Sequence, residues 1–338
     1  MKRRSLLLAS AGVLTASLTL SATAVASDQD YILATASTGG TYYPVGVAIS
    51  TLAKVKLQPK HKFSVSAISS AGSGENIRLL RENEAQFAIL QGLFGYYAAS
   101  GTGPLANDGP QTYIRSVSML WQNVEHFLVS ADLAKTGTAD DLLGLKGKTV
   151  AMGAKNSGTI GSNGHLLGGL GVDLDKDVEH YYAGYGPSAD ALQNGQVAGA
   201  GIAAGVPASA VTKLMASGAD KVRLLTFSSD QITRADDGAN LWTAFEIPAG
   251  TYPNQTDAVT TLAQPNFLAT HQDVSEEHVY LLTKSIYENL PFLNAIHPAT
   301  KAMALERAIS GLPAPLHPGA TKFYQEQGIN IPSRLIAK

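Results

Sequence analysis

Short apolar runs that alternate with amphipathic stretches indicate a mixed α/β protein. Buried strands are expected where apolar residues run together, at residues 31–34, 63–68, 86–91, 148–153, 178–183 and 197–202. Apolar residues at helical spacing predict helices over residues 45–53, 77–80, 159–170 and 189–192. The turns before these helices are rich in glycine and small hydroxyl residues, a composition typical of helix starts.

The same strand–turn–helix order occurs twice, over residues 31–91 and again over residues 148–202. Leu80-Arg81-Glu82-Asn83-Glu84-Ala85 also aligns with Leu192-Gln193-Asn194-Gly195-Gln196-Val197, and each run is a helix end leading into a buried strand. This repetition predicts two similar α/β lobes. Because ligands bind outside the carboxyl ends of strands in open α/β sheets, the turns of both lobes are expected to face one cleft.

Two apolar runs are expected to connect the lobes as a hinge. Residues 120–129 form the predicted crossing strand, and residues 264–270 the return strand. Helical patterns at 276–290, with Ser275 as a possible cap, and at 298–309 would then pack back on the first lobe, before a last short helix near 320–327. We therefore assign residues 27–129 and 262–338 to lobe I and residues 130–261 to lobe II.

The N-terminus reads as a targeting segment. Lys2-Arg3-Arg4 is a basic start, residues 6–20 are apolar, and Ala24-Val25-Ala26 fits a cleavage site. Residues 1–26 are thus a predicted signal peptide, for which a buried N-terminal helix is the alternative. The Arg3-Arg4 pair also allows a twin-arginine signal, although a general secretory signal is favoured. No later stretch is apolar for 18 residues, so we expect an exported, unanchored, periplasmic protein.

Composition narrows the function further. The chain has 338 residues, enough for two lobes, and a net charge of −2 with 15% charged residues, so nucleic-acid binding is not expected. It contains no cysteine, which excludes disulfides, zinc–thiolate sites and thiol catalysis. Phosphate-loop, zinc-protease and esterase motifs are missing, so neither an enzyme nor a cofactor is predicted.

The strongest candidate for a binding site is the turn Ser37-Thr38-Gly39-Gly40-Thr41-Tyr42-Tyr43-Pro44, between the first strand and its helix. Small hydroxyls, glycines and bare backbone N–H groups at the positive end of a helix dipole can hold an anion without Lys or Arg. Asn156-Ser157-Gly158-Thr159 is its counterpart in the second half. A third turn, residues 69–74, precedes a helix for which Ser73 is the expected N-cap.

Several other side chains could belong either to a functional site or to the packed interior. His126 beside Glu125 could be a base with its carboxylate, but neighbours on a strand point to opposite faces, so a structural His126 is favoured. Tyr42 and Tyr185 could line a cleft or simply pack, and Trp121 could stack on a ligand or fill the lobe junction. Gln91, at a strand end, could simply close a turn.

The opening turn, extended through Val45-Gly46, resembles the first motif of the TAXI-type substrate-binding proteins of tripartite ATP-independent periplasmic (TRAP) transporters. The similarity runs through most of the mature chain. It continues in Ser73-Gly74-Glu75-Asn76, Ala88-Ile89-Leu90-Gln91, Asn156-Ser157-Gly158-Thr159, Ala204-Gly205-Val206-Pro207, Ile247-Pro248-Ala249-Gly250-Thr251-Tyr252 and Leu316-His317-Pro318-Gly319-Ala320.

This resemblance implies a type II periplasmic-binding-protein fold, with two lobes, a hinge and a ligand cleft between them. It implies a monomeric receptor that hands a small organic anion, a carboxylate such as glutamate or 2-oxoglutarate, to TRAP permease subunits for ion-coupled uptake. A ligand sensor that feeds a membrane signalling partner is the alternative function, and an enzyme on the same fold is a less favoured one. By analogy, Ser73, Asn76 and Gln91 join the opening turn in lining lobe I, and Ser157, Gly158 and Thr159 line lobe II.

Departures from the family pattern concern specificity. Gly92-Leu93 stands where Ser-Asp is common, Trp121-Gln122-Asn123 replaces Tyr-Pro-Glu, and Ala200-Gly201 replaces bulky aromatics. Asn123 would remove a negative charge, and the small residues would enlarge or reshape the pocket. The full predicted ligand-binding set is Thr38, Gly39, Gly40, Thr41, Tyr42, Ser73, Asn76, Gln91, Trp121, Asn123, Ser157, Gly158, Thr159 and Tyr185.

Overall fold

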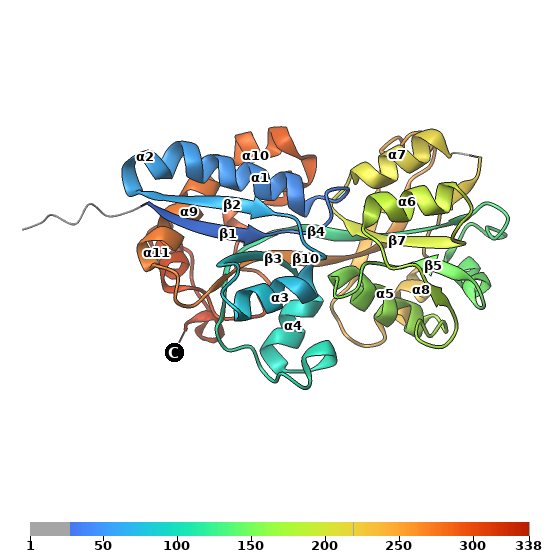
Figure 1. Cartoon of the computed structure of the whole chain (residues 1–338), viewed down its shortest axis with the longest axis horizontal. Helices are drawn as coiled ribbons and strands as arrows, with labels where there is room; N and C mark the ends of the chain where they lie inside the picture. Colours follow the sequence, from blue (N-terminus) through green and yellow to red (C-terminus); the bar gives the residue numbers. More distant parts are fainter. Residues whose placement is uncertain (1–27, 219, 338) are drawn as a thin grey trace, which may run out of the picture.

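The computed structural model describes residues 28–218 and 220–337, and it has two lobes joined by long strands of one continuous sheet (Figure 1). This confirms the predicted two-lobed α/β fold. The predicted signal peptide lies outside the described residues. The strands are β1 (Gln29–Ala34), β2 (Phe63–Ile68), β3 (Phe87–Gln91), β4 (Ile114–Ser130), β5 (Thr149–Ala151), β6 (Glu179–His180), β7 (Gly199–Ala204), β8 (Val222–Leu224), β9 (Thr243–Ile247) and β10 (Val259–His271).

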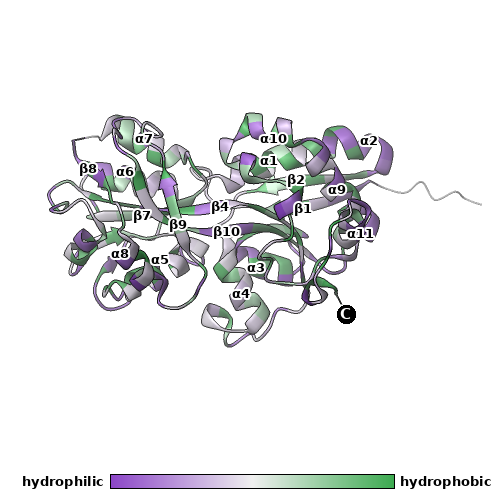
Figure 2. Ribbon diagram, turned by 180° about the vertical axis from the view of Figure 1, so that it is seen from behind, coloured by the Kyte–Doolittle hydropathy of each residue, from purple (hydrophilic) through white to green (hydrophobic). Residues whose placement is uncertain are grey.

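Helices cover both faces of the sheet in each lobe (Figure 1). Outer helix α2 is hydrophilic in Figure 2, as expected for a helix that faces solvent. In the described part of the chain, no helix is long and apolar enough to cross a membrane. The helices are α1 (Tyr42–Leu52), α2 (Gln58–His61), α3 (Ser73–Arg81), α4 (Gly92–Ser100), α5 (Gly158–Gly169), α6 (Tyr185–Gln193), α7 (Ser209–Ser217), α8 (Ser229–Asp236), α9 (Glu276–Glu288), α10 (Leu290–Ile296) and α11 (Pro318–Glu326).

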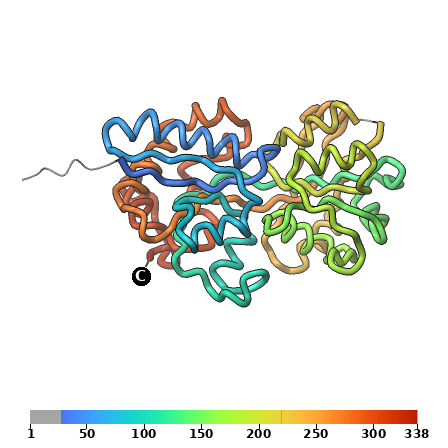
Figure 3. Tube along the Cα trace, in the orientation of Figure 1, coloured from blue at the N-terminus to red at the C-terminus, as the bar shows by residue number. Residues whose placement is uncertain are grey.

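Strands β4 and β10 run antiparallel through the centre of the sheet, whose order is β2-β1-β3-β10-β4-β7-β5-β6. One part of β10 pairs with β3 and another with β9, while β4 pairs with β7 and β8 toward its C-terminal end. The chain trace follows these strands from one lobe into the other (Figure 3). The crossing strands predicted at 120–129 and 264–270 are therefore present, and both are longer than expected.

The two halves end their helices alike, as the aligned sequences predict. After α3 the chain turns at Asn83, with φ of 55°, and after α6 it turns at Gly195, with φ of 70°. Asn and Gly are the residues that adopt this left-handed conformation most readily. In both lobes, a residue in the left-handed conformation thus ends the helix and leads the chain into a buried strand, β3 or β7.

The core is closely packed around the central strands. Phe87, Phe127 and Phe267 are almost completely buried on β3, β4 and β10. Burying a side chain of this size contributes roughly 1.5–3 kcal/mol. Strand β7 is buried throughout and consists of small residues and one Ile, which lets neighbouring elements approach it closely. At Gly201, an added Cβ would lie 2.1 Å from Nδ2 of Asn163 on α5.

Three predictions about local structure were wrong. The stretch 298–309 forms short 3₁₀ turns (Pro298–Ala302 and Leu305–Arg307), in part because the carbonyl of Ala308 accepts a hydrogen bond from Met119 N on β4. The strand expected at 178–183 is reduced to β6, and the turn expected at 184–188 is the first turn of α6. Proline is tolerated in that first turn because its missing N–H would have no partner within the helix.

Candidate functional site

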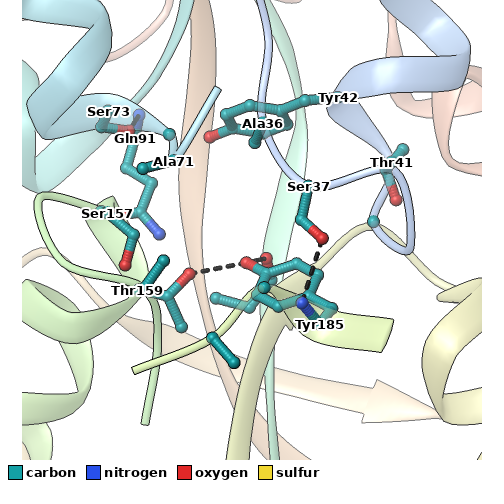
Figure 4. A pocket seen from close by; sticks show the side chains of 17 residues that line it. Ala36, Ser37, Thr41, Tyr42, Ala71, Ser73, Gln91, Ser157, Thr159 and Tyr185 are labelled. Carbon is teal, nitrogen blue, oxygen red and sulfur yellow. Dashed lines mark hydrogen bonds between the residues drawn. The ribbon is translucent and has the colours of Figure 1, made fainter. Parts of the chain in front are cut away.

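A small cavity lies between the lobes, at the carboxyl ends of the strands (Figure 4). Its volume is about 20 Å³, the space of one or two water-sized spheres. The lobes are therefore closed, and an organic acid could reach this space only after they separate. The cavity is lined by Ala36, Ser37, Gly40, Thr41, Tyr42, Ala71, Gly72, Ser73, Gln91, Ala154, Ser157, Gly158, Thr159, Ala183, Gly184, Tyr185 and Ala203.

The N-termini of helices α1, α3, α5 and α6 converge on this cavity. Tyr42, Ser73, Gly158 and Tyr185 are the first residues of these helices, and each of them lines it. Each N-terminus carries about half a positive charge and N–H groups without intrahelical partners. Among the described residues, no Lys or Arg lines the cavity, so the positive potential there comes from the backbone.

The opening turn of lobe I makes direct bonds to lobe II. The hydroxyl of Ser37 accepts a hydrogen bond from Tyr185 N at 3.0 Å, and that of Thr41 donates to the carbonyl of Gly205 at 3.0 Å. Thr41 Oγ1 also lies 3.4 Å from Nε2 of His297, which is bonded to the Pro207 carbonyl at 3.1 Å. The turn therefore joins the two lobes by hydrogen bonds in addition to lining the cavity.

Ser73 does not cap helix α3, as the sequence had suggested. Gly72, with φ of 119°, occupies the N-cap position, and the Ser73 hydroxyl instead accepts from Gln91 N at 3.0 Å. A side chain would strain the backbone at Gly72, since L residues rarely adopt this φ. The bond ties the start of α3 to the end of β3 and holds Ser73 and Gln91 together at the cavity wall.

On the lobe II side, helix α5 is capped by Ser157, whose hydroxyl accepts from Ile160 N at 3.0 Å. The hydroxyl of Tyr185 donates to the carbonyl of Ala203 at 2.6 Å and therefore accepts from Thr159 Oγ1, also at 2.6 Å. Burial raises the pKa of the Tyr185 phenol above its ordinary value, so it stays protonated. Figure 4 shows this chain of hydroxyls beneath Ser37.

The closed contact depends on glycine at two positions. A Cβ on Gly158 would lie 2.4 Å from Oε1 of Gln91, and one on Gly74 would lie 2.5 Å from the carbonyl oxygen of Asn156. That same carbonyl accepts from Glu75 N at 2.9 Å, joining α3 of lobe I to the turn before α5. Asn156 adopts φ of 60°, a conformation that Asn tolerates, and so presents the carbonyl to α3.

The predicted ligand-binding residues divide into two groups. Those that line the cavity are Gly40, Thr41, Tyr42, Ser73, Gln91, Ser157, Gly158, Thr159 and Tyr185. Those that lie outside its lining are Thr38, Gly39, Asn76, Trp121 and Asn123. Ser37, which the cavity does use, could have been added from the sequence, because it belongs to the same hydroxyl-rich turn.

The five predicted residues that do not line the cavity lie at its margin or in the protein interior. Thr38 is exposed, and the Gly39 carbonyl accepts from Ser209 Oγ and Ala210 N. The Asn76 amide donates to the carbonyls of Thr35 and Ile89, so it supports the turn from behind. Trp121 is buried at the lobe junction, with its ring against Tyr42. Asn123 is buried on β4.

Glu125 and His126 do not act as a pair. His126 bonds to the carbonyl of Ile202 at 3.0 Å and to the hydroxyl of Tyr252 at 2.7 Å, whereas Glu125 accepts from Trp242 on the other face of β4. Burial lowers the pKa of His126 to about 4 and raises that of Glu125 to about 7. The structural interpretation of His126 is confirmed.

Metal binding has no obvious place in the described residues, among which no group of three His, Cys, Asp or Glu could hold an ion. The space expected at Gly201 is filled by Asn163, which donates to the Met152 carbonyl at 3.0 Å. Gly201 therefore adds no space to the cavity, and neither Ala200 nor Gly201 lines it.

Comparison with known proteins identifies relatives at the level of family and fold. The NMT1-like family matches residues 33–328. A solved structure of a protein from Bordetella bronchiseptica RB50 has a TM-score of 0.53 at 15% identity, covering 88% of this chain and 82% of that one. At this identity the likeness concerns the fold alone.

Two sulfonate-binding proteins are also similar, with TM-scores of 0.44 and 14% identity each. The alignment with the alkanesulfonate-binding protein SsuA from Xanthomonas axonopodis pv. citri, bound to MOPS, covers 80% of this chain and 74% of the SsuA chain. The alignment with the periplasmic aliphatic sulphonate binding protein SsuA from Escherichia coli covers 89% of this chain and 84% of that SsuA chain.

Proposed function

The chain belongs to the NMT1-like family, and we propose that it is an exported receptor that binds a small organic anion between its lobes and delivers it to a membrane permease. The observation that carries this proposal is the convergence of the N-termini of α1, α3, α5 and α6 on one interlobe cavity. Such N-termini favour an anion and supply directed N–H donors for it.

The energetics are adequate for a receptor. A dissociation constant of about 1 µM requires roughly −8 kcal/mol. Each hydrogen bond to a charged group contributes on the order of 1.5–3 kcal/mol, so about four to six bonds suffice and leave a surplus for ordering and closure. Backbone N–H groups of Gly158 and Thr159 and the hydroxyls of Ser37, Ser73 and Ser157 are the donors available at the cavity.

Closure couples binding to recognition by a partner. We propose that residues 27–129 and 262–338 move as lobe I against residues 130–261 as lobe II, about the strands β4 and β10. A ligand that touches both lobes would hold them further apart than they are here, and it would shift the population toward that closed arrangement because it contacts only one lobe in the open one. The permease would then recognise the closed surface.

The finer assignment follows the resemblance described above. We propose a TAXI-type receptor of a TRAP transporter, exported to the periplasm by the segment 1–26, monomeric, and specific for a small carboxylate. A sensor that presents its bound form to a signalling partner would use the same cavity. Permease genes beside the gene for this protein would favour transport.

A thermal-shift screen of small carboxylates, amino acids and sulfonates tests the proposal, followed by titration calorimetry and mass spectrometry of the released ligand. We expect a carboxylate to raise the melting temperature and to bind as one unaltered molecule per chain. Recovery of a chemically altered ligand would instead indicate an enzyme on this fold. If no anion in the screen binds, the receptor proposal is wrong.

A further inference from the structure

Below the cavity, a group of buried polar side chains occupies one face of neighbouring strands. We call it the polar floor; its members are Gln91 on β3, Gln264 and Asn266 on β10, and Asn123 and Glu125 on β4. Asn266 pairs in register with Gln91, and Gln264 pairs with Asn123. Residues directly opposite in an antiparallel pair share a face, and so do alternate residues of one strand, which places all five on the same side.

This face is the one that the cavity lies on. Gln91 itself lines the cavity, and Glu125 pairs in register with Ala203, which also lines it. The hydroxyl of Tyr42, a third lining residue, donates to Oδ1 of Asn266. The polar floor therefore reaches the cavity at Gln91, and its other members lie on the same face of the sheet, outside the cavity lining.

Several atoms of the polar floor lack partners. Asn123 is 1% exposed, yet neither its Oδ1 nor its Nδ2 has a hydrogen-bond partner among residues 28–218 and 220–337. Over the same residues, Nδ2 of Asn266 and Oε1 of Gln91 are also without one. By contrast, the equally buried Asn76 donates to backbone carbonyls and accepts from Ser70.

Buried amides without partners destabilise a folded protein, so they are retained where they serve another purpose. An amide offers both a donor and an acceptor, and is neutral. It suits a hydroxyl or oxo group, whereas a buried ammonium needs a compensating charge. The neighbouring Glu125, whose Oε2 also lacks a partner among the described residues, is only partly ionised at neutral pH, because burial raises its pKa to about 7.

We propose that Asn123, with Asn266 and Gln91, forms a specificity subsite for an uncharged polar group of the ligand. The preferred ligand is then a hydroxy or oxo acid, in preference to the plain acid or the amino acid. This inference rests on the proposed receptor function. The anionic end would be held by the helix N-termini, and the hydroxyl or oxo group by the amides at the base of the opened cleft.

Matched acids test this specificity by calorimetry on the full mature chain. The probes are glutarate, 2-hydroxyglutarate, 2-oxoglutarate and glutamate, and the three-carbon series propionate, lactate, pyruvate and alanine. In the series that binds, we expect the hydroxy or oxo acid to bind about tenfold or more tightly than both the plain acid and the amino acid. Equal affinities, or tightest binding of the amino acid, would overturn the proposal.

Two variants assign the effect to Asn123. Asn123→Leu should remove the tenfold advantage and leave the affinity for the plain acid unchanged, whereas equal weakening of all probes would point to a structural role. At a pH high enough to ionise a buried carboxyl, Asn123→Asp should weaken the oxo acid and favour the amino acid, because it introduces a charge that can pair with an ammonium.

A ligand-free measurement can overturn the subsite independently of the probes. If no probe binds, it is the carboxylate receptor proposal that fails. Removing a buried amide without partners should raise the melting temperature of Asn123→Leu by about 2–4 °C. The matched control Asn76→Leu should lower it, because that amide is fully bonded. A lower melting temperature for Asn123→Leu would show that the amide stabilises the fold, and would overturn the subsite.

Discussion

Replacing Gly74 with alanine should weaken ligand binding without harming the fold. Gly74 is the second residue of α3 and lies against the turn that precedes α5 in the other lobe. Alanine is a better helix former than glycine by about 1 kcal/mol, so α3 itself should be stabilised. The added methyl group acts mainly against the closed state, since its closest obstacle belongs to the other lobe, whereas Phe94 of the same lobe, at 3.3 Å, needs to shift only slightly.

The size of the effect follows from two distances. The new Cβ would lie 2.5 Å from the carbonyl oxygen of Asn156, where ordinary contacts begin at 3.4 Å. Relieving this clash means moving backbone, which lengthens the 2.9 Å bond from Glu75 N to the same carbonyl. Losing that bond costs about 1 kcal/mol, and 1 kcal/mol corresponds to about fivefold in Kd. We therefore expect Kd to rise at least about fivefold.

Calorimetry with the tightest anion of the screen measures Kd, and small-angle scattering with and without that anion measures closure. The control is Gly168→Ala on α5, where an added Cβ meets nothing within 4 Å and only helix propensity changes. The control should bind and close like the parent chain. If Gly74→Ala also keeps the parent Kd and the same ligand-induced contraction, then closure through α3 and Asn156 is not part of binding.

Other variants probe the site separately. Because burial raises the pKa of Glu125 from 4.5 to about 7, its contribution to stability is complete below pH 4.5 and is lost as pH rises toward 7. Glu125→Gln should thus stabilise the chain more at pH 8 than at pH 5, by about 2–3 kcal/mol in urea titrations; an equal effect at both pH values would contradict a raised pKa. Ser157→Ala removes the cap of α5 and should reduce the free energy of unfolding by about 1 kcal/mol. An unchanged free energy of unfolding would show that this cap does not stabilise the protein. Thr41→Ala and Thr159→Ala should each weaken ligand binding by at least about 1 kcal/mol, and each should also lower the ligand-free melting temperature, because each removes a buried hydrogen bond. Unchanged affinity in both would remove these hydroxyls from the site.

Much of the cavity could be predicted from sequence because its parts are local. The turns around Thr41 and Thr159 combine small hydroxyls, glycine and a following helix, and these features place N–H groups at the end of a strand in any α/β lobe. The hydrogen bonds of Asn76 are different, since they reach carbonyls on two other elements. Its role behind the turn was therefore not visible in the sequence.

The polar floor was the least predictable part. Its members come from β3, β4 and β10, which are distant in sequence, and only the strand register brings Gln264 opposite Asn123. Ser73 was misassigned as an N-cap for a related reason, because its partner Gln91 lies on another element. Such contacts depend on which elements pack together in the folded protein, and the hydrophobic and polar pattern of a single segment carries little information about that.

We propose that helix N-termini, without a cation, hold the anion between the lobes. A crystal structure of the protein with the tightest carboxylate of the screen tests it most directly. We expect the anionic group between the lobes, about 2.7–3.2 Å from the N–H groups of Gly158 and Thr159 and in contact with a lobe I hydroxyl as well. An anion held by Lys or Arg outside this cavity would contradict it.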